Sequence, residues 1–272
     1  MTQTVLYDRK ANPDYIPRVA AVHDLCGYGK CSLGIAIPVV SAGGCDVCPV
    51  PTGLFSSHTA FPGWYMHDTT DILPDYLAAW QNIGVEIDAI YSGFLGAPEQ
   101  VDIIRSLYER YPKALRVVDP VMADHGKVYP TYTPELCAAM ADLACDADIL
   151  TPNLTEAAII LGEEWHGTDI SNDEAKRIID ALIEKGAKNV VLKGVQREGE
   201  SVIRNFAAGV DIDFFEASNE YLPYMLHGTG DLYCSCLLAA IMAGRTLQEA
   251  VEFAGDLTHD AMIVSSKQPN FK

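Results

Sequence analysis

One stretch decides the fold of this chain: His227-Gly228-Thr229-Gly230-Asp231-Leu232-Tyr233-Cys234-Ser235-Cys236. It runs without a break into the apolar segment Leu237-Leu-Ala-Ala-Ile-Met-Ala243, which has the length of a buried helix. Two glycines around a threonine remove the Cβ atoms that would keep a ligand away from the backbone. We therefore predict a helix start whose free N–H groups and positive dipole end face an anion such as a phosphate.

Asp231 would lie in the first turn of this helix, beside the bound anion. An anion and a carboxylate at one helix tip indicate phosphoryl transfer. The alternative is an ordinary helix start, in which Gly228 and Gly230 form a turn and Asp231 only stabilises the dipole. A helix N-terminus favours the charged form of a carboxylate, so we expect the pKa of Asp231 not to be raised. Such a weak base suffices if the transition state is loose and mainly needs an oriented nucleophile.

The composition is that of a globular protein with an excess of acidic groups. Apolar residues make up 49% and charged residues 21%, which is ordinary globular composition, and the length of 272 residues favours a single domain spanning residues 1–272. The formal net charge of −18, with no Lys/Arg cluster, argues against a nucleic-acid or anionic-membrane partner. An acidic protein that binds a polyanion must neutralise it locally. We therefore expect Mg²⁺, backbone N–H groups and a few cationic side chains at the site.

The sequence also predicts a compartment. Residues 1–17 are polar and interrupted by prolines, so they indicate an N-terminal extension and not a signal peptide. No uncharged apolar run of about 18 residues occurs, and we expect a soluble, cytoplasmic protein. The eight cysteines are scattered, and Cys45-x-x-Cys48 has no second Cys/His pair at the spacing of a zinc finger. We therefore expect reduced and mostly buried thiols.

Segments with strand and helix patterns alternate along the chain. Strands are expected at residues 18–23, 45–50, 88–93, 115–119, 147–151 and 189–194. Helices are expected at residues 32–42, 71–83, 98–111, 133–144, 153–161, 171–186 and 247–264, besides the one after the glycine turn. This alternation predicts an α/β fold with a mostly parallel central sheet and helices on both faces. Residues 196–222 depart from it and predict a β-hairpin joined by Ala207-Ala-Gly209.

Polar side chains follow the expected strands, where the loops of an open parallel sheet form a ligand crevice. Asp24 opens the glycine-broken loop after the first strand, and Ser57-His58-Thr59 follows the second. A substrate contact and a role in the turn explain Asp24 equally well. Residues 60–67 mix aromatics with Pro and Gly and are too irregular for an element. They indicate a flap over a flat ligand, although packing on the core would explain the aromatics almost as well.

The order of four motifs is more specific than any one of them. The motifs are Asp119-Pro-Val-Met-Ala-Asp124, Thr151-Pro-Asn153-Leu-Thr-Glu156, Lys193-Gly194 and Gly228-Thr-Gly-Asp231. In this order, over about residues 18–265, the chain resembles the ribokinase superfamily and, within it, the pyridoxal/pyridoxamine kinases. The resemblance implies a single-domain ribokinase-like fold, with the hairpin near the nucleotide. It also implies ATP-dependent phosphorylation of the 5′-hydroxymethyl group of pyridoxamine, pyridoxal or pyridoxine.

The same resemblance implies a role for each motif residue. Asp231 would be the catalytic base, and the turn of Gly228, Thr229 and Gly230 would hold the transferred phosphoryl group. The implied nucleotide-binding residues are Thr151, Lys193, Asp119 and Thr229. Mg²⁺ would be held, largely through water, by Asn153, Glu156, Asp124 and Asp119. The implied vitamer-binding residues are Asp24, Ser57, His58, Thr59 and Phe94.

Two departures keep a second substrate open. Pyridoxal kinases commonly carry a serine-histidine pair after the first strand, whereas this chain has His23-Asp24-Leu25-Cys26-Gly27. That loop is similar to the aspartate loop of hydroxymethylpyrimidine kinases, and Lys193-Gly194 favours the same alternative. Ser57-His58-Thr59 favours pyridoxal kinase. Hydroxymethylpyrimidine is therefore the alternative substrate, and both candidates are flat heterocycles with a hydroxymethyl group.

A catalytically silent, vitamer-binding regulator is the alternative of another class. It predicts damage to Asp231, Asn153, Glu156 or the glycines, and all of these are intact. The sequence leaves open which vitamer is preferred and whether a monovalent cation such as K⁺ is required. It also leaves open the oligomeric state, for which the resemblance implies a homodimer.

Overall fold

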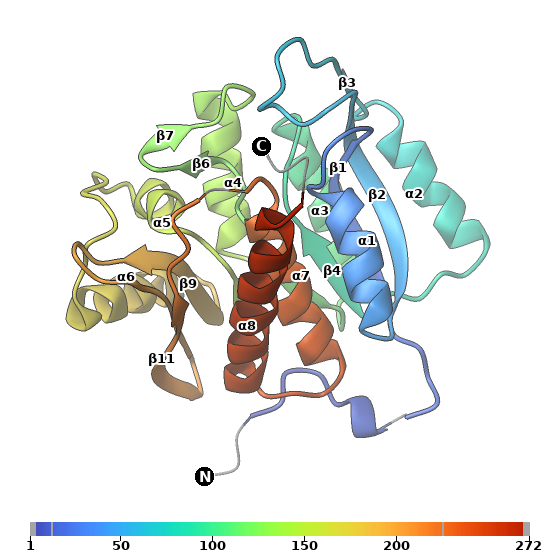
Figure 1. Ribbon diagram of the computed structural model, residues 1–272. Helices are drawn as coiled ribbons and strands as arrows, with labels where there is room; N and C mark the ends of the chain where they lie inside the picture. Colours follow the sequence, from blue (N-terminus) through green and yellow to red (C-terminus); the bar gives the residue numbers. More distant parts are fainter. Residues whose placement is uncertain (1–3, 12, 225, 269–272) are drawn as a thin grey trace.

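A nine-stranded sheet forms the centre of the computed structural model, which describes residues 4–11, 13–224 and 226–268. The strand order is β11-β10-β9-β8-β5-β4-β1-β2-β3 (Figure 1). The parallel strands are β1 (Arg18–Cys26), β2 (Asp46–Phe55), β4 (Ala89–Ser92), β5 (Leu115–Val118), β8 (Ile149–Leu150) and β9 (Asn189–Gln196). Antiparallel strands complete both edges: β3 (Met66–Asp68), β10 (Val202–Gly209) and β11 (Ile212–Glu220). The predicted mostly parallel sheet is confirmed.

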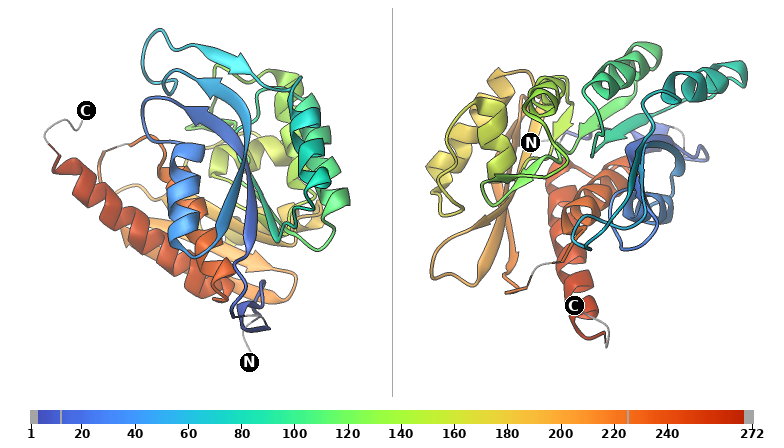
Figure 2. Two further views of the ribbon diagram at one scale, coloured as in Figure 1. Left: turned by 90° about the vertical axis from the view of Figure 1, so that its right-hand side faces the viewer. Right: turned by 90° about the horizontal axis from the view of Figure 1, so that it is seen from above.

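Helices cover both faces of the sheet. Their buried residues assign α1 (Leu33–Ala42), α7 (Thr229–Met242) and α8 (Leu247–Ser266) to one face. The other face carries α2 (Leu73–Asn82), α3 (Glu99–Arg110), α4 (Pro134–Ala144), α5 (Leu154–Leu161) and α6 (Asn172–Glu184). Figure 2 shows α1 and α8 on one side of the strands and α3 on the other. Side chains alternate along each strand, so Val19 and Ala20 of β1 enter different cores.

The first described residues of the chain contact α8 and the central sheet region. Val5 forms an isolated antiparallel bridge with Thr246, and a short 3₁₀-helix spans Arg9–Ala11. The hydroxyl of Tyr15 donates to Asp88 Oδ2 at 3.0 Å. Residues 1–3 and 12 of the predicted extension lie outside the described residues. Of the helices in the described part of the chain, none combines the length and the apolar character needed to cross a membrane.

The second strand is longer than its sequence pattern predicts. β2 runs on to Phe55, although Pro49 and Pro51 interrupt it. Both prolines pair with β1 on one side, while β3 covers only the last residues of the strand on the other. A proline is tolerated in a strand whose N–H groups face a free edge. Residues 66–68 form β3, so the prediction that residues 60–67 contain no element was wrong at its end.

The predicted hairpin is present, but its turn lies further along the chain. β10 and β11 pair antiparallel, and Gly209 lies opposite Ile212. Ala207, which was expected in the turn, pairs with Val191 of β9 and with Phe215 of β11. Its small side chain is fully buried there. Burial between two neighbouring strands thus outweighs the weak strand propensity of alanine. A separate two-stranded sheet, β6 (Ala123–Asp124) and β7 (Lys127–Val128), precedes α4.

Candidate active site

The turn before α7 has the conformation that its first glycine allows. Gly228 has a φ of 83°, and a Cβ atom there would lie 2.3 Å from the backbone oxygen of Lys30. Thr229 is the first residue of α7. A Cβ atom at Gly230 would have Lys193 Nζ as its nearest neighbour, at 3.7 Å. The first N–H groups of a helix have no partner within it, so this turn presents donors beside an ammonium group and can bind an anion.

Asp231 lies in the first turn of α7, where its Oδ2 accepts a hydrogen bond from the backbone N–H of Ser32 at 2.9 Å. Burial raises the pKa of Asp231 to about 7, against the lowering effect of that hydrogen bond. The charges of Asp119 and Asp24 raise it further, and Lys193 lowers it. The prediction that this pKa is not raised was wrong, because the loss of water outweighs the helix dipole. Asp231 is therefore a base matched to neutral pH.

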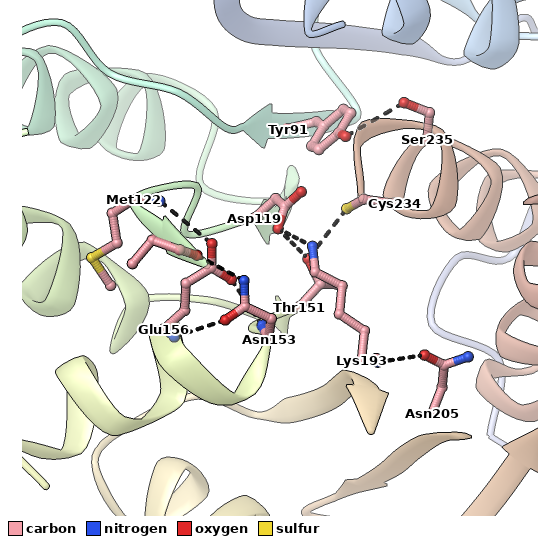
Figure 3. A network of polar contacts seen from close by, with 12 residues as sticks. Tyr91, Asp119, Met122, Thr151, Asn153, Glu156, Lys193, Asn205, Cys234 and Ser235 are labelled. Atoms are coloured by element: carbon pink, nitrogen blue, oxygen red, sulfur yellow. Dashed lines mark hydrogen bonds and ion pairs between the residues drawn. The ribbon is translucent and has the colours of Figure 1, made fainter. Parts of the chain in front are cut away.

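An ion pair beside this turn joins Lys193 of β9 to Asp119, which follows β5, across the intervening strand β8 (Figure 3). Lys193 Nζ lies 2.5 Å from Asp119 Oδ1, and the hydroxyl of Thr151 donates to the same oxygen at 3.1 Å. Burial disfavours the Lys193 ammonium, but the charges of Asp119 and Glu156 raise the pKa of Lys193 overall. Lys193 is thus a permanent cation. The structure brings together three of the residues predicted to bind the nucleotide.

Asn153 and Glu156 form a capping box at the start of α5. Asn153 Oδ1 accepts from the backbone N–H of Glu156 at 2.9 Å, and Glu156 Oε2 accepts from that of Asn153 at 2.8 Å. The N–H of Met122 reaches Glu156 Oε1 at 3.4 Å, and Asn153 Nδ2 donates to the carbonyl of Ala123 at 2.8 Å. Burial raises the pKa of Glu156 to about 8. Each polar side-chain atom of the pair therefore has a protein partner.

Asp119 has the carboxylate oxygen best suited to a divalent cation. Its Oδ2 is buried and has no hydrogen-bond partner among the described residues. Such an atom is costly to bury, and a cation would remove the cost. The side chain of Asp124 is 43% exposed and lies in the two-stranded sheet. The donor set fits Mg²⁺ if Asp119 binds it and Glu156 and Asn153 act through water.

Asp24 lies inside β1, because this strand continues to Cys26 and does not end at His23 as predicted. The Asp24 side chain is 4% exposed, and its Oδ2 accepts a hydrogen bond from the thiol of Cys26 at 3.3 Å. Burial raises the pKa of Asp24. The neighbouring His23 is fully buried, and neither of its ring nitrogens has a partner among the described residues. Burial lowers the pKa of His23 to about 3, so it is a neutral core side chain.

The loop after β2 meets the turn before α7. The ring centroid of His58 lies 4.7 Å from that of His227 and 4.4 Å from that of Phe61. Burial, with a smaller effect of His227, lowers the pKa of His58. Ser57 is half-buried beside His58, and Thr59 is exposed. His58 thus connects the predicted vitamer loop with the glycine turn before α7.

Phe94 lies mainly in the protein core. Only 8% of it is exposed, and its ring packs edge-on against Phe55 at 5.5 Å and Tyr132 at 5.6 Å. The hydroxyl of Thr52 holds its carbonyl at 2.8 Å. A contact between the Phe94 ring and a vitamer stays a prediction.

Two further residues, Tyr129 and His227, lie at the site although the sequence predicts no role for either of them. Burial raises the pKa of Tyr129, and the charges of Glu156 and Asp124 raise it further. Tyr129 therefore lies among the acidic residues, although nothing in the sequence around it distinguishes it from other tyrosines. His227 belongs to the stretch that decides the fold, but only its stacking with His58 indicates a place at the site.

The chain is similar in sequence to one protein family and to proteins named pyridoxal kinase. The model of the phosphomethylpyrimidine kinase family matches residues 62–271. Pyridoxal kinase PdxY from Histophilus somni (strain 2336) is 30% identical over 239 residues, which cover 80% of this chain and 79% of the relative. The protein of the same name from Haemophilus influenzae (strain PittEE) is 31% identical over 226 residues, with coverage of 77% and 75%.

Solved structures share the whole fold. A putative phosphomethylpyrimidine kinase from Bacteroides thetaiotaomicron VPI-5482, crystallised with pyridoxal, matches with a TM-score of 0.90 and 33% identity, over 94% of this chain and 91% of that one. Pyridoxal kinase from Lactobacillus plantarum matches with a TM-score of 0.85 and 27% identity, over 94% and 92%. The chain therefore belongs to the phosphomethylpyrimidine kinase family and has the ribokinase-like fold of the pyridoxal kinases.

Proposed function

We propose that this protein is an ATP-dependent kinase that phosphorylates the 5′-hydroxymethyl group of a B6 vitamer, pyridoxal, pyridoxamine or pyridoxine. One observation carries the proposal: Asp231, with a pKa of about 7, lies in the first turn of α7 beside the anion-binding glycines. The relatives named pyridoxal kinase, and the structural neighbour crystallised with pyridoxal, support this class of substrate.

Asp231 orients the vitamer and receives its proton. As the hydroxymethyl oxygen forms a bond to the γ-phosphorus of ATP, its proton passes to Asp231, and the bond from that phosphorus to the bridging oxygen breaks to release ADP. The N–H groups at the start of α7 bind the phosphoryl oxygens during the transfer. Ser32 keeps the carboxylate in place through its backbone N–H.

Lys193 and Asp119 prepare the site for the nucleotide. The Lys193 ammonium is fixed by Asp119 and faces the glycine turn, so it can attract the phosphates despite the net negative charge of the chain. Asp119 Oδ2 would hold Mg²⁺, with Glu156 and Asn153 acting through water and Asp124 nearby. When bound, Mg²⁺ neutralises charge on the nucleotide phosphates.

Hydroxymethylpyrimidine is the second candidate substrate. It is favoured by the description of the matching family and by Asp24 within β1, a buried acceptor for a polar heterocycle. A catalytically silent regulator would bind a vitamer without turnover. Of these alternatives, only the kinases use Asp231 as a base.

A coupled assay of ADP release tests the proposal. Pyridoxal, pyridoxamine, pyridoxine and hydroxymethylpyrimidine are each supplied with ATP, with and without Mg²⁺ and K⁺. We expect Mg²⁺-dependent turnover with at least one B6 vitamer and a lower kcat/KM with hydroxymethylpyrimidine. The reverse order would make the pyrimidine the substrate. Vitamer binding without ADP release from any compound would support the regulator.

We also propose that residues 1–272 form one domain and that the protein acts as a homodimer in the cytoplasm. These assignments rest on the sequence and on the resemblance to pyridoxal kinases. Light scattering of the purified protein and fractionation of cells test them. A monomeric mass would contradict the homodimer.

A further inference from the structure

Three side chains able to bind a metal meet at the end of β1, and the proposed reaction makes no use of two of them. Asp24, Cys26 and Cys31 each place one ligand atom within 4.8 Å of the other two. Cys26 Sγ lies 3.3 Å from Asp24 Oδ2. Both cysteines are free thiols. Asp24 and Cys26 are buried and Cys31 is half-buried, so the cluster is enclosed but can be reached from one side.

The loop between β1 and α1 brings these residues together. The chain leaves β1 at Cys26 and reverses direction through Gly29, which has a φ of 89°, and Ser32, which has a φ of 47°. A positive φ is uncommon for serine and needs support from its surroundings. The hydrogen bond from the Ser32 N–H to Asp231 provides it. Cys31 is therefore held near Cys26 by the same loop that positions the catalytic carboxylate.

The Cys-x-x-Cys motif of the chain cannot form such a cluster. Cys45 is buried in the core under α1, α7 and α8, whereas Cys48 packs against the core on the other face of the sheet. Residues three apart in an extended segment point to opposite faces. Cys26 and Cys31, which have no metal-binding spacing, are the pair that the fold brings together.

We propose that Asp24, Cys26 and Cys31 bind a thiophilic divalent cation of the Zn²⁺ type. Two thiolates and a carboxylate suit Zn²⁺, and three protein ligands leave a fourth position for water. Ligand atoms in a tetrahedral zinc site lie about 3.5 Å apart, which Cys26 and Asp24 already satisfy and Cys31 can reach by a small movement. Binding releases the two thiol protons and leaves one net negative charge from the three anionic ligands and the cation.

A bound cation would inhibit the proposed kinase. It would occupy Asp24, the candidate vitamer contact, next to the Ser32 backbone that holds Asp231. Asp24 and Asp231 both act on the vitamer in the proposed reaction. Inhibition should therefore be competitive with the vitamer and not with ATP. This consequence rests on the proposed function, whereas the binding itself does not.

Metal binding is tested first, without any assay of activity. Cd²⁺ is titrated into the reduced full-length protein in buffer with excess Mg²⁺, and the thiolate-to-metal absorption band is followed. We expect one equivalent of Cd²⁺ to bind at this cluster. Excess Mg²⁺ should not displace it, because Mg²⁺ prefers oxygen ligands. Cys31→Ala should weaken binding at least tenfold, and so should Cys26→Ser. The control Cys45→Ala/Cys48→Ala should bind as tightly as the wild type.

Several results would overturn the metal site. These are no thiolate band, equal affinity in Cys31→Ala and the wild type, or loss of binding only in the control. A disulfide between Cys26 and Cys31 that persists under reductant, shown by counting thiols, would also overturn it. Thermal unfolding shows whether each variant is folded. If Cys26→Ser does not fold, Cys31→Ala still tests the site, because Cys31 is only half-buried.

Activity is tested second. Zn²⁺ should raise the KM for the vitamer at least tenfold in the wild type, and a chelator should reverse the effect. Cys31→Ala should abolish the inhibition without changing basal kcat more than threefold. Stoichiometric Cd²⁺ binding by a protein with no turnover would refute the proposed function and leave the metal site standing.

Discussion

Replacing Asp231 with Asn separates the catalytic role of this carboxyl from its effect on stability. Asn keeps the size of the side chain, and its oxygen can still accept the hydrogen bond from the Ser32 N–H, now 2.9 Å long. It cannot accept the proton of the vitamer hydroxyl. We expect ATP binding to persist and kcat to fall roughly 10²–10⁴-fold, the usual contribution of a positioned base.

The sign of the stability effect follows from the raised pKa. The pKa of Asp231 is about 7 in the folded protein, against 3.8 for an aspartate side chain in water, so the folded state holds its proton more tightly. The wild type therefore loses stability as the pH rises from about 4 to 7, and the loss is constant above that. Three pKa units correspond to about 4 kcal/mol. Partial exposure of the side chain reduces this to about 2 kcal/mol.

Thermal unfolding and kinetics at several pH values test both effects. Asp231→Asn should have a Tm about 4–6 °C above that of the wild type at pH 8 and an equal Tm near pH 4. The exposed Asp213→Asn, on β11, is the matched control and should change neither Tm nor activity. In the wild type, kcat/KM should fall about tenfold per pH unit below 7. Activity of Asp231→Asn within threefold of the wild type, or a flat wild-type profile from pH 5.5 to about 8.5, would refute the reasoning.

The remaining predictions concern the metal, the substrate and the glycine turn. Glu156→Gln keeps an acceptor for the α5 cap and should raise the Mg²⁺ requirement more than the vitamer KM; an unchanged Mg²⁺ titration would exclude Glu156 from the site. Asp24→Asn should lower kcat/KM for pyridoxamine at least tenfold more than for pyridoxine, because only the amine can form an ion pair; equal losses would mean that Asp24 contacts a group the vitamers share. Gly228→Ala should lower the free energy of unfolding by about 1–3 kcal/mol, because Gly228 has a positive φ and a Cβ atom there would meet a backbone oxygen. Gly230→Ala makes no such contact and should stay within about 1 kcal/mol of the wild type. Equal free energies of unfolding for the two variants would contradict the packing of the turn.

Parts of the site could be predicted because they are local. The glycine turn before α7 and the Asn-x-x-Glu motif at α5 are helix starts, and the residues within one turn set their geometry. The motif alone did not reveal that all polar side-chain atoms of Asn153 and Glu156 have protein partners, two in the helix cap and two in the segment before β7. That requires the carbonyl and the N–H of residues about 30 positions away, at Ala123 and Met122.

Other parts depend on contacts between distant residues. The pKa of Asp231 is raised because the β1–α1 loop and the strand ends exclude water from it, and no property of the helix start predicts that burial. The pairing of Lys193 with Asp119 joins two strands that are separated in the sheet by β8. Tyr129 became a candidate only when its acidic neighbours were known.

The sequence by itself determined the α/β class, the alternation of elements and the position of the glycine turn that we propose binds phosphate, because periodicity and local backbone preferences set these. It also determined the order of the motifs, and with it the family. The tertiary structure alone decided the raised pKa of Asp231, the buried free oxygen of Asp119 and the meeting of Cys26 with Cys31. The physical reason is that desolvation and ligand geometry depend on which distant segments pack together, and neither is encoded in the spacing along the chain.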